Sequence, residues 1–222
     1  NDAIRVSVVS EQADLLEHGM LRLDRDVKLQ TLSKLLRRHD GTAIIFGRTK
    51  HGVKKLNRNL QQMGHNSVEL QGDLSQSIRD RAMAAFREGR SQILVATNVA
   101  ARGIDVESVG LVVNFELPDS AQWLTHRVGR TARMGETGRA LTFVTPEDEP
   151  AWVKLSREGA PHIRELDVRR LLEDGAWHYR EARPMSSHAP SPGRGAGSAA
   201  RPRYRGRRTS SFSRSGAARR TY

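Results

Sequence analysis

The sequence predicts an α/β fold, in which a doubly wound and mostly parallel sheet carries helices on both faces and is followed by a disordered basic tail. Short apolar runs rich in β-branched residues alternate with longer stretches of helical periodicity, which is typical of a layered α/β domain. Several of these runs are almost entirely apolar, as expected for strands that are covered on both faces. The composition of the last forty residues predicts the tail.

Six short segments are expected to form strands. In chain order they are Ile4–Val9, Ala43–Phe46, Ser67–Leu70, Gln92–Ala96, Leu111–Phe115 and Ala140–Val144. Because the parallel strands of a doubly wound sheet end at one edge, we expect the loops after them to form the ligand-binding edge of the domain.

Six longer segments are expected to form helices. The first, Val27–Arg38, places four leucines on one face. The others are 51–63, 76–88, 120–132, Glu147–Arg157 and Asp167–Asp174. Gly64 and Gly89 are expected to end the second and third helices. We therefore place an α/β domain at residues 1–159, a short helical extension at 160–182 and the tail at 183–222.

The tail carries most of the formal charge of the chain. Residues 183–222 contain ten Arg, no Lys, Asp or Glu, and no Leu, Ile or Val, so they hold +10 of the net +12. Such a segment cannot bury enough apolar area to offset its chain entropy. Tyr204 and Phe212 lie among the arginines, a pattern that binds nucleic acid through phosphate attraction and base stacking. A solubilising linker is the alternative interpretation.

Composition also excludes several classes of function. Cysteine is absent, which excludes disulfides, thiolate catalysis and Cys-ligated metal. The eight histidines show no metal-ligand spacing, so we expect no metal site on this chain. No run approaches the ~20 apolar residues of a membrane-spanning helix, and no signal-peptide pattern is present.

The segment 92–104, QILVATNVAARGI, predicts a buried strand that runs into a polar and small-residue loop. Thr97, Asn98, Arg102, Gly103 and Asp105 leave the strand at its carboxyl end, which is where an open α/β sheet binds ligands. An ordinary turn at Gly103 fits the same pattern equally well.

The segment 126–133, HRVGRTAR, places Arg127, Arg130 and Arg133 three residues apart with no carboxylate between them. On the predicted helix 120–132 they would lie on roughly one side, where like charges repel unless an anion is supplied. Guanidinium groups bind phosphate oxygens in a fork and can stabilise charge on a transferring γ-phosphoryl group. The pattern favours a phosphate site over a solvated helix face.

Two further loops are candidates for binding anions. In GDLSQSIRDR, at 72–81, Ser75 is expected to cap a helix whose first turns offer Gln76 and Arg79. FGRTK, at 46–50, is a strand end with a basic loop. Helix starts bind phosphate groups, although a capped surface helix is the likelier interpretation of either loop in isolation.

Four motifs, taken in their order and spacing, resemble those of one protein family. They are IIFGRTK at 44–50, LQGDLSQSIRDR at 70–81, ATNVAARGIDV at 96–106 and HRVGRTAR at 126–133. The set resembles the second, C-terminal RecA-like domain of DEAD-box ATP-dependent RNA helicases, in particular the bacterial branch with basic tails. The resemblance runs from about Ile4 to Trp152 and implies a RecA-like fold.

The resemblance implies that ATP, with Mg²⁺, binds in a cleft between this domain and an N-terminal RecA-like domain of the same protein. Arg130 and Arg133 match the arginine fingers, which contact the γ-phosphate and stabilise the transition state. Asp105 matches the carboxylate that binds the ribose hydroxyls, and Gly103 lets the backbone pass the nucleotide. His126 and Arg127 match positions at the interface between the two domains.

Single-stranded and duplex RNA are the partners that the resemblance implies, with no membrane partner and a cytoplasmic location. The positions that match RNA-backbone contacts are Thr49, Gly72, Gln76, Arg79, Thr97 and Arg102. Contacts to phosphates and 2′-hydroxyls carry no base information, so binding is expected to be largely independent of sequence.

Parts of such an enzyme are missing from the chain. It contains no GxxxxGK[ST] loop and no Asp-Glu-Ala-Asp sequence, so we expect the phosphate loop and the magnesium ligands on the N-terminal domain of a longer protein. The chain alone is expected to be inactive. The acidic cluster Pro146–Pro150 is interpreted as a helix cap. Asn98 stands where the family more often has Asp, which removes a charge.

Two functions of different classes follow from these patterns. The first is one half of an ATP-dependent RNA helicase that unwinds short duplexes. The second is a nucleic-acid-binding module without catalysis, in which the basic tail dominates. A DNA helicase or translocase of the same superfamily is a third alternative.

Overall fold

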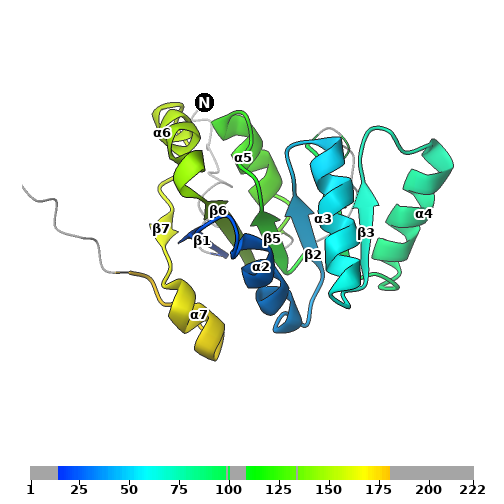
Figure 1. Cartoon of the computed structure of the whole chain (residues 1–222), viewed down its shortest axis with the longest axis horizontal. Coiled ribbons are helices and arrows are strands. Elements are labelled where there is room, and N and C mark those ends of the chain that lie inside the picture. The colour runs from blue at the N-terminus through cyan, green and yellow to red at the C-terminus, as the bar shows by residue number, and fades with distance from the viewer. Residues whose placement is uncertain (1–14, 99, 101–108, 134, 181–222) are drawn as a thin grey trace, which may run out of the picture. The chain divides into compact units, whose positions relative to one another are not determined.

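The computed structural model describes residues 15–98, 100, 109–133 and 135–180 (Figure 1). Contacts divide the chain after Ala182, and the second unit, residues 183–222, lies outside the described residues. The predicted strand Ile4–Val9 and the predicted tail therefore also lie outside them.

A seven-stranded sheet forms the centre of the domain, and all its ladders are parallel, as predicted. The strand order is β3-β4-β2-β5-β6-β1-β7. The strands are β1 (Leu16–Arg22), β2 (Ala43–Phe46), β3 (Ser67–Leu70), β4 (Ile93–Ala96), β5 (Leu111–Asn114), β6 (Gly138–Val144) and β7 (Arg164–Glu165). The non-consecutive order confirms the doubly wound α/β fold.

The strand predictions hold where the sequence is apolar. β2 and β3 have the predicted bounds, and β4, β5 and β6 differ from them by one or two residues. The sequence prediction missed β1 and β7. β1 reads LEHGMLR, in which Glu17 and His18 interrupt the apolar pattern, and β7 has two residues.

The helices lie within a residue or two of their predicted bounds, with one exception. They are α2 (Lys28–Arg37), α3 (Lys50–Gln62), α4 (Gln76–Arg87), α5 (Ala121–Val128), α6 (Glu149–Arg157) and α7 (Val168–Asp174), with a 3₁₀ turn at Pro146–Asp148. Gly64 and Gly89 have φ of 85° and 71°, the left-handed conformation that ends α3 and α4. Asp148 forms a capping box with Thr145, so the acidic cluster is a cap.

The exception is α5, which ends at Val128 instead of continuing to residue 132. Beyond it, the amides of Arg130 and Thr131 donate to carbonyls three residues back, and Ala132 has φ of 54°. The Thr131 hydroxyl donates to the carbonyl of Val109, which holds this turn on the sheet. The prediction that three arginines share one helix face was therefore wrong.

Helices cover both faces of the sheet (Figure 1). Alternate residues of β2 separate the two layers: Ala43 and Ile45 pack with α2, α3 and α7, whereas Ile44 and Phe46 pack with α4 and α5. All four side chains are at most 1% exposed. The predicted extension is part of this core, because β7 pairs with β1 and Leu171 of α7 is buried in the first layer.

Four strands end level with one another at the edge where the predicted motifs lie. Phe46 pairs with Ala96 and Asn114, and Ala96 pairs with Leu70, so these last residues of β2, β4, β5 and β3 form one row. The loops that follow them are therefore neighbours, as expected for the ligand-binding edge of a doubly wound sheet.

Candidate functional site

The loop after β2 is held in place by two hydrogen bonds. Thr49 is the N-cap of α3, and its Oγ1 accepts a hydrogen bond from the Gly52 amide at 3.0 Å. The Arg48 amide donates to Oε2 of Glu116 at 2.6 Å, and Glu116 lies on the loop after β5. Arg48, Thr49 and Lys50 remain exposed, so the loop offers cations and a hydroxyl at the edge.

The loop after β3 lies beside it. Lys50 Nζ and Asp73 Oδ1 are 2.8 Å apart and join the two loops across the surface. Gly72 is exposed, and no atom lies within 4 Å of the position that a Cβ would take there. A backbone from another molecule can therefore approach closely at Gly72.

The start of α4 differs from the prediction. Ser75 is the N-cap residue, but its side chain caps no amide and lies 3.4 Å from the Ser77 hydroxyl. The Gln76 side chain donates to Asp80 at 2.7 Å, and Arg79 is half-buried. Because the side-chain cap is missing, the first amides of this helix are open to an outside acceptor such as a phosphate oxygen.

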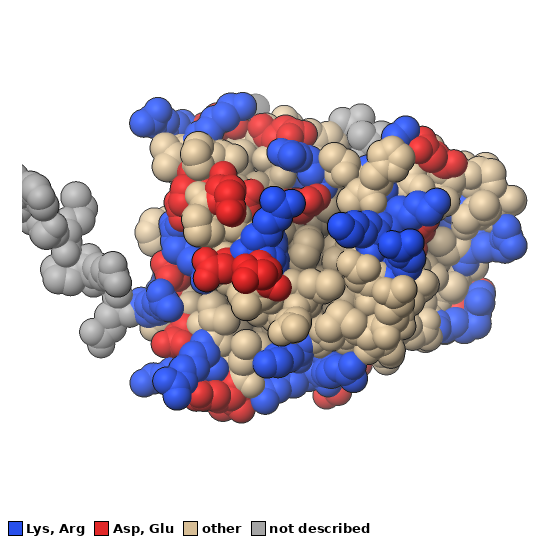
Figure 2. Space-filling model, viewed as in Figure 1, with Lys and Arg blue, Asp and Glu red and all other residues tan. Residues whose placement is uncertain are grey.

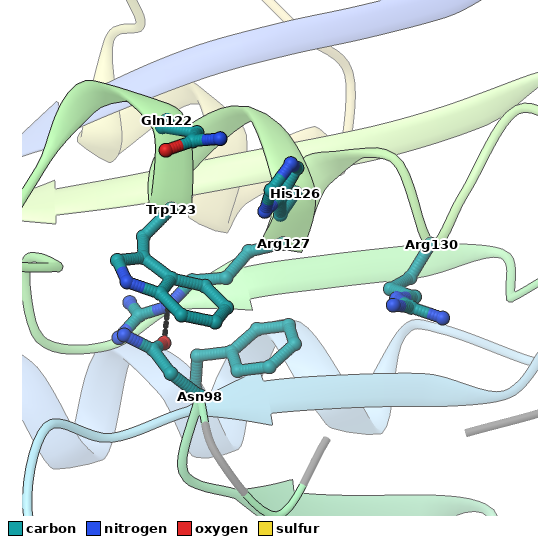
Figure 3. Close-up of a pocket in the computed structure, with 7 residues that line it drawn as sticks. Asn98, Gln122, Trp123, His126, Arg127 and Arg130 are labelled. Atoms are coloured by element: carbon teal, nitrogen blue, oxygen red, sulfur yellow. Dashed lines mark hydrogen bonds between the residues drawn. The ribbon is translucent and has the colours of Figure 1, made fainter. Parts of the chain in front are cut away.

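Arg127, the penultimate residue of α5, points into its own domain and is 1% exposed. Its Nε donates to Asn98 Oδ1 at 2.6 Å (Figure 3). Its Nη1 donates to Asn114 Oδ1 at 3.2 Å and to the Glu116 carbonyl at 2.6 Å. The guanidinium carbon lies 5.0 Å from the centroid of the Phe46 ring. This side chain thus ties α5 to the ends of β2, β4 and β5.

The Arg127 guanidinium is a buried cation, and the three oxygens to which it donates are all neutral. Burial lowers the pKa of Arg127 to about 9, while the charges of Asp119 and Glu116 act in the opposite direction. The group therefore keeps its proton at neutral pH. Its Nη2 is buried and has no hydrogen-bond partner among the described residues. Asn98, in place of a carboxylate, leaves this charge without a direct ion pair in the network.

A chain of buried polar side chains continues from Arg127 across the sheet. Asn114, which is 0% exposed, donates to Thr142 Oγ1 at 3.0 Å. Thr142 Oγ1 lies 2.9 Å from His18 Nε2 on β1. Burial lowers the pKa of His18 to about 4, so the imidazole is neutral at pH 7. No local pattern indicates this chain of contacts, because Asn114, Thr142 and His18 lie on three strands far apart in sequence.

Arg130 and Arg133 lie beyond α5 and are both half-buried. Burial is the main cause that lowers the pKa of Arg130, and the charge of Arg133 adds to it. Arg133 Nε donates to the carbonyl of Gly129 at 2.5 Å. The charge of Arg133 thus acts on Arg130, whereas the Arg127 guanidinium is held in its own network inside the domain.

A cavity of about 300 Å³ opens over the Arg127 network. Figure 3 shows Trp123 and His126 of α5 on one side of it, Asn98 on the other, and Arg130 standing apart on the following turn. The Trp123 and His126 rings meet edge to face, with centroids 5.6 Å apart. His126 is exposed and can contact another domain or a ligand at this rim.

The structure brings most of the predicted residues to one edge. Thr97 follows β4, is 7% exposed, and its amide donates to the carbonyl of Leu70 at 3.2 Å. Thr49, Gly72, Gln76 and Arg79 lie on the neighbouring loops. Arg102, Gly103 and Asp105 lie outside the described residues.

Sequence reasoning missed Asn114 and Glu116 as parts of this edge. Both could have been found, because an open α/β sheet binds ligands at the carboxyl ends of its strands. Asn114 and Glu116 stand at such an end, in the sequence VVNFE. It also missed Trp123, whose position beside His126 was not predicted.

The fold and this edge define a helicase C-terminal domain. Residues 27–135 match the family described as "Helicase conserved C-terminal domain". Within the described part of the chain, we find no helix with the length and apolar character needed to span a membrane.

The solved structures narrow the class. E. coli DEAD-box protein SrmB, in a crystal structure with regulator of ribonuclease activity A, is 33% identical with a TM-score of 0.65, covering 76% of this chain and 98% of that one. The C-terminal domain of the DEAD-box protein Dbp5 is 32% identical with a TM-score of 0.64, covering 72% and 97%. This chain is the C-terminal domain of a DEAD-box RNA helicase family member.

Full-length relatives come from bacteria and fungi. The DEAD-box ATP-dependent RNA helicase CshA of Bacillus subtilis is 38% identical over 147 residues, 66% of this chain and 30% of that protein. The ATP-dependent rRNA helicase rrp3 of Neosartorya fischeri is 38% identical over 174 residues, 77% of this chain and 37% of that protein. The chain thus spans about a third of each relative, and the bacterial branch stays a prediction.

Proposed function

We propose that this chain is the C-terminal half of an ATP-dependent RNA helicase that unwinds short RNA duplexes. In this proposal Arg130 and Arg133 stabilise the γ-phosphoryl group of ATP, which a preceding RecA-like domain holds together with Mg²⁺. The observation that carries the proposal is the Arg130 side chain, which follows α5 and lines the cavity with Phe46 and Asn98 at the strand ends, within reach of the charge of Arg133.

The environment of the two arginines supports a phosphate as their ligand. Partial burial lowers the pKa of Arg130, and the charge of Arg133 lowers it further. A phosphate oxygen between or beside them would offset both effects, and guanidinium groups bind such oxygens in a fork. The Arg127 side chain cannot take this role without leaving its own network, because its guanidinium is buried inside the domain.

RNA would bind along the loops after β2, β3 and β4. Thr49 offers a hydroxyl at the start of α3, Gly72 leaves room for a backbone, and the uncapped start of α4 offers amides beside Gln76 and Arg79. All these groups suit phosphates and ribose hydroxyls rather than base edges. We therefore expect binding that is largely independent of RNA sequence.

The Arg127 network would couple the two ligands. It joins Asn98, on the loop that follows Thr97, to the last turn of α5, and Arg130 follows that turn directly. A shift of the RNA-binding loop would therefore be transmitted to the turn that carries the arginine fingers. ATP supplies the binding free energy for closure of the two domains, and phosphate loss allows them to reopen.

Replacing Arg79 by Ala should weaken RNA binding and lower its dependence on salt. One lost phosphate contact is expected to reduce the slope of log K against log salt by about 0.7 for single-stranded RNA. Titrations of RNA at several salt concentrations measure this slope. Arg157→Ala, at an exposed position of α6, is the matched control. A slope for Arg79→Ala equal to that of the parent chain would rule out the contact.

The chain by itself should not hydrolyse ATP. Its 222 residues contain no GxxxxGK[ST] loop to hold the β- and γ-phosphates. Phosphate release from the purified chain, with and without RNA, checks this expectation. ATP turnover that disappears with Arg130→Ala would show that the chain is active alone. It would contradict the proposal that a second domain is needed to complete the ATP site.

The arginine-rich residues 183–222 favour a second candidate function, a nucleic-acid-binding module without catalysis. Deleting these residues distinguishes the two. If ATP hydrolysis by the two-domain protein stays RNA-stimulated without them, they are an anchor. If the domain shows no coupling of ATP to RNA in any context, the binding module is the correct description.

A further inference from the structure

The outer face of α3 is strongly basic. Lys50, His51, Lys54, Lys55 and Arg58 are all exposed, whereas the buried residues of the helix face the sheet. At 3.6 residues per turn, the five basic side chains cover an arc of about 140°. Figure 2 shows Lys and Arg side chains gathered over this helix. We call these five residues the α3 basic face.

This arrangement is unfavourable for the helix itself. Lys50 and Lys54, and Lys54 and Arg58, are like charges four residues apart, and such pairs destabilise an isolated helix. The first turn contains no acidic residue, and the last turn contains no basic one. The cations thus lie toward the positive end of the helix dipole, where they are least stable.

Few groups of the domain compensate these charges. Lys50 pairs with Asp73, but no salt bridge joins Lys54, Lys55 or Arg58 to a carboxylate among the described residues. A hollow of about 370 Å³ lies on the face, lined by Lys54 and Arg58 among others. The one carboxyl group that lines this hollow is Glu69. Burial raises the pKa of Glu69, and the charge of Lys54 offsets only part of this effect.

We propose that the α3 basic face binds the phosphate backbone of RNA that extends beyond the strand edge. The inference rests on the proposed function, because the face begins at Thr49, which we place at the RNA-binding edge. RNA leaving that edge over α3 would pass Lys50 first and then Lys54 and Arg58. A bound polyanion offsets the repulsion along the face, which the domain alone does not.

The size of the face sets the length of RNA needed to reach it. α3 has 13 residues and is therefore about 20 Å long. At about 3.4 Å of axis per phosphate, roughly six nucleotides follow its length. An RNA confined to the strand edge should not sense the face, whereas the same RNA extended by about six nucleotides at either end should.

The test compares two double variants of the full chain. Lys54→Gln/Arg58→Gln removes two charges from the face, and Arg157→Gln/Arg170→Gln removes two exposed charges from α6 and α7. Both keep residues 183–222, so the contribution of that segment is common to them. Affinity is measured over a range of salt for a short single-stranded RNA and for its extended form.

For the extended RNA, the α3 variant should bind roughly tenfold more weakly at 0.1 M salt, with a slope lower by about 1.4. The control variant should match the parent chain, and the short RNA should bind both variants alike. An equal loss of affinity for the two RNAs would place Lys54 and Arg58 in the RNA site at the strand ends. It would overturn the proposal that the α3 basic face is a separate binding surface. No loss on either would also overturn it and would leave an acidic protein as the partner of the face.

A failure of this inference can be distinguished from a failure of the proposed function on which it rests. Binding of the short RNA, and its sensitivity to Arg79→Ala, test the strand edge without involving the α3 basic face. If Lys54→Gln/Arg58→Gln leaves RNA affinity unchanged while Arg79→Ala still weakens binding, only the inference about the α3 basic face is overturned. If Arg79→Ala has no effect while the α3 variant weakens binding, the proposed RNA site at the strand ends is overturned.

Discussion

Replacing Arg130 or Arg133 by Ala should lower RNA-stimulated ATP hydrolysis by about a thousandfold in a protein that joins this chain to its preceding domain. The reason is electrostatic: charge that develops on the γ-phosphoryl oxygens in the transition state loses a fixed guanidinium partner. Steady-state phosphate release at saturating RNA and ATP measures the effect.

The fold should survive these substitutions. Both side chains are half-buried, and Arg133 makes its hydrogen bond to the carbonyl of Gly129 within the same turn. Urea unfolding of each variant provides the control, with a midpoint close to that of the parent. Near-normal turnover in a well-folded variant would remove the catalytic role that we assign.

Replacing Arg127 by Met should have a different effect and destabilise the domain by about 3 kcal/mol or more. The substitution keeps much of the apolar volume but removes the donors to Asn98, Asn114 and the Glu116 carbonyl. Buried acceptors left without donors each cost about 1–3 kcal/mol. Removing a buried charge recovers part of this cost, because its desolvation is no longer required.

Urea unfolding followed by circular dichroism measures the Arg127→Met effect, with Arg133→Ala as the control on the neighbouring turn. A change below about 1 kcal/mol would show that desolvation of the guanidinium cancels its hydrogen bonds. In that case Arg127 would not be the residue that holds the strand ends and α5 together, and the proposed coupling through it would be contradicted.

The sheet could be predicted from local patterns because its central strands are buried on both faces. Ala43–Phe46 and Ser67–Leu70 have the bounds that their composition indicated. β1 could not be found in the same way, since Glu17 and His18 interrupt its apolar pattern and its position depends on pairing with β6, more than 100 residues later. Such pairing is a property of the tertiary fold and leaves little trace in a short segment.

The site was predictable as a set of residue types at strand ends, but the roles within it were not. Three evenly spaced arginines in HRVGRTAR suggested one helix face, whereas α5 ends at Val128 and turns Arg127 inward. Gly129 and the left-handed Ala132 favour this turn, but Ala gives no sign of such a conformation in a sequence. The neutral network around Arg127 requires contacts from β4 and β5 that no local pattern specifies.

The most direct test of the central claim is a structure of the two-domain protein with RNA and a non-hydrolysable ATP analogue. The account predicts guanidinium nitrogens of Arg130 and Arg133 within about 3 Å of γ-phosphate oxygens, with Arg127 still bound to Asn98 and Asn114. Guanidinium groups of Arg130 and Arg133 paired inside their own domain, while the nucleotide is held by other residues, would contradict it.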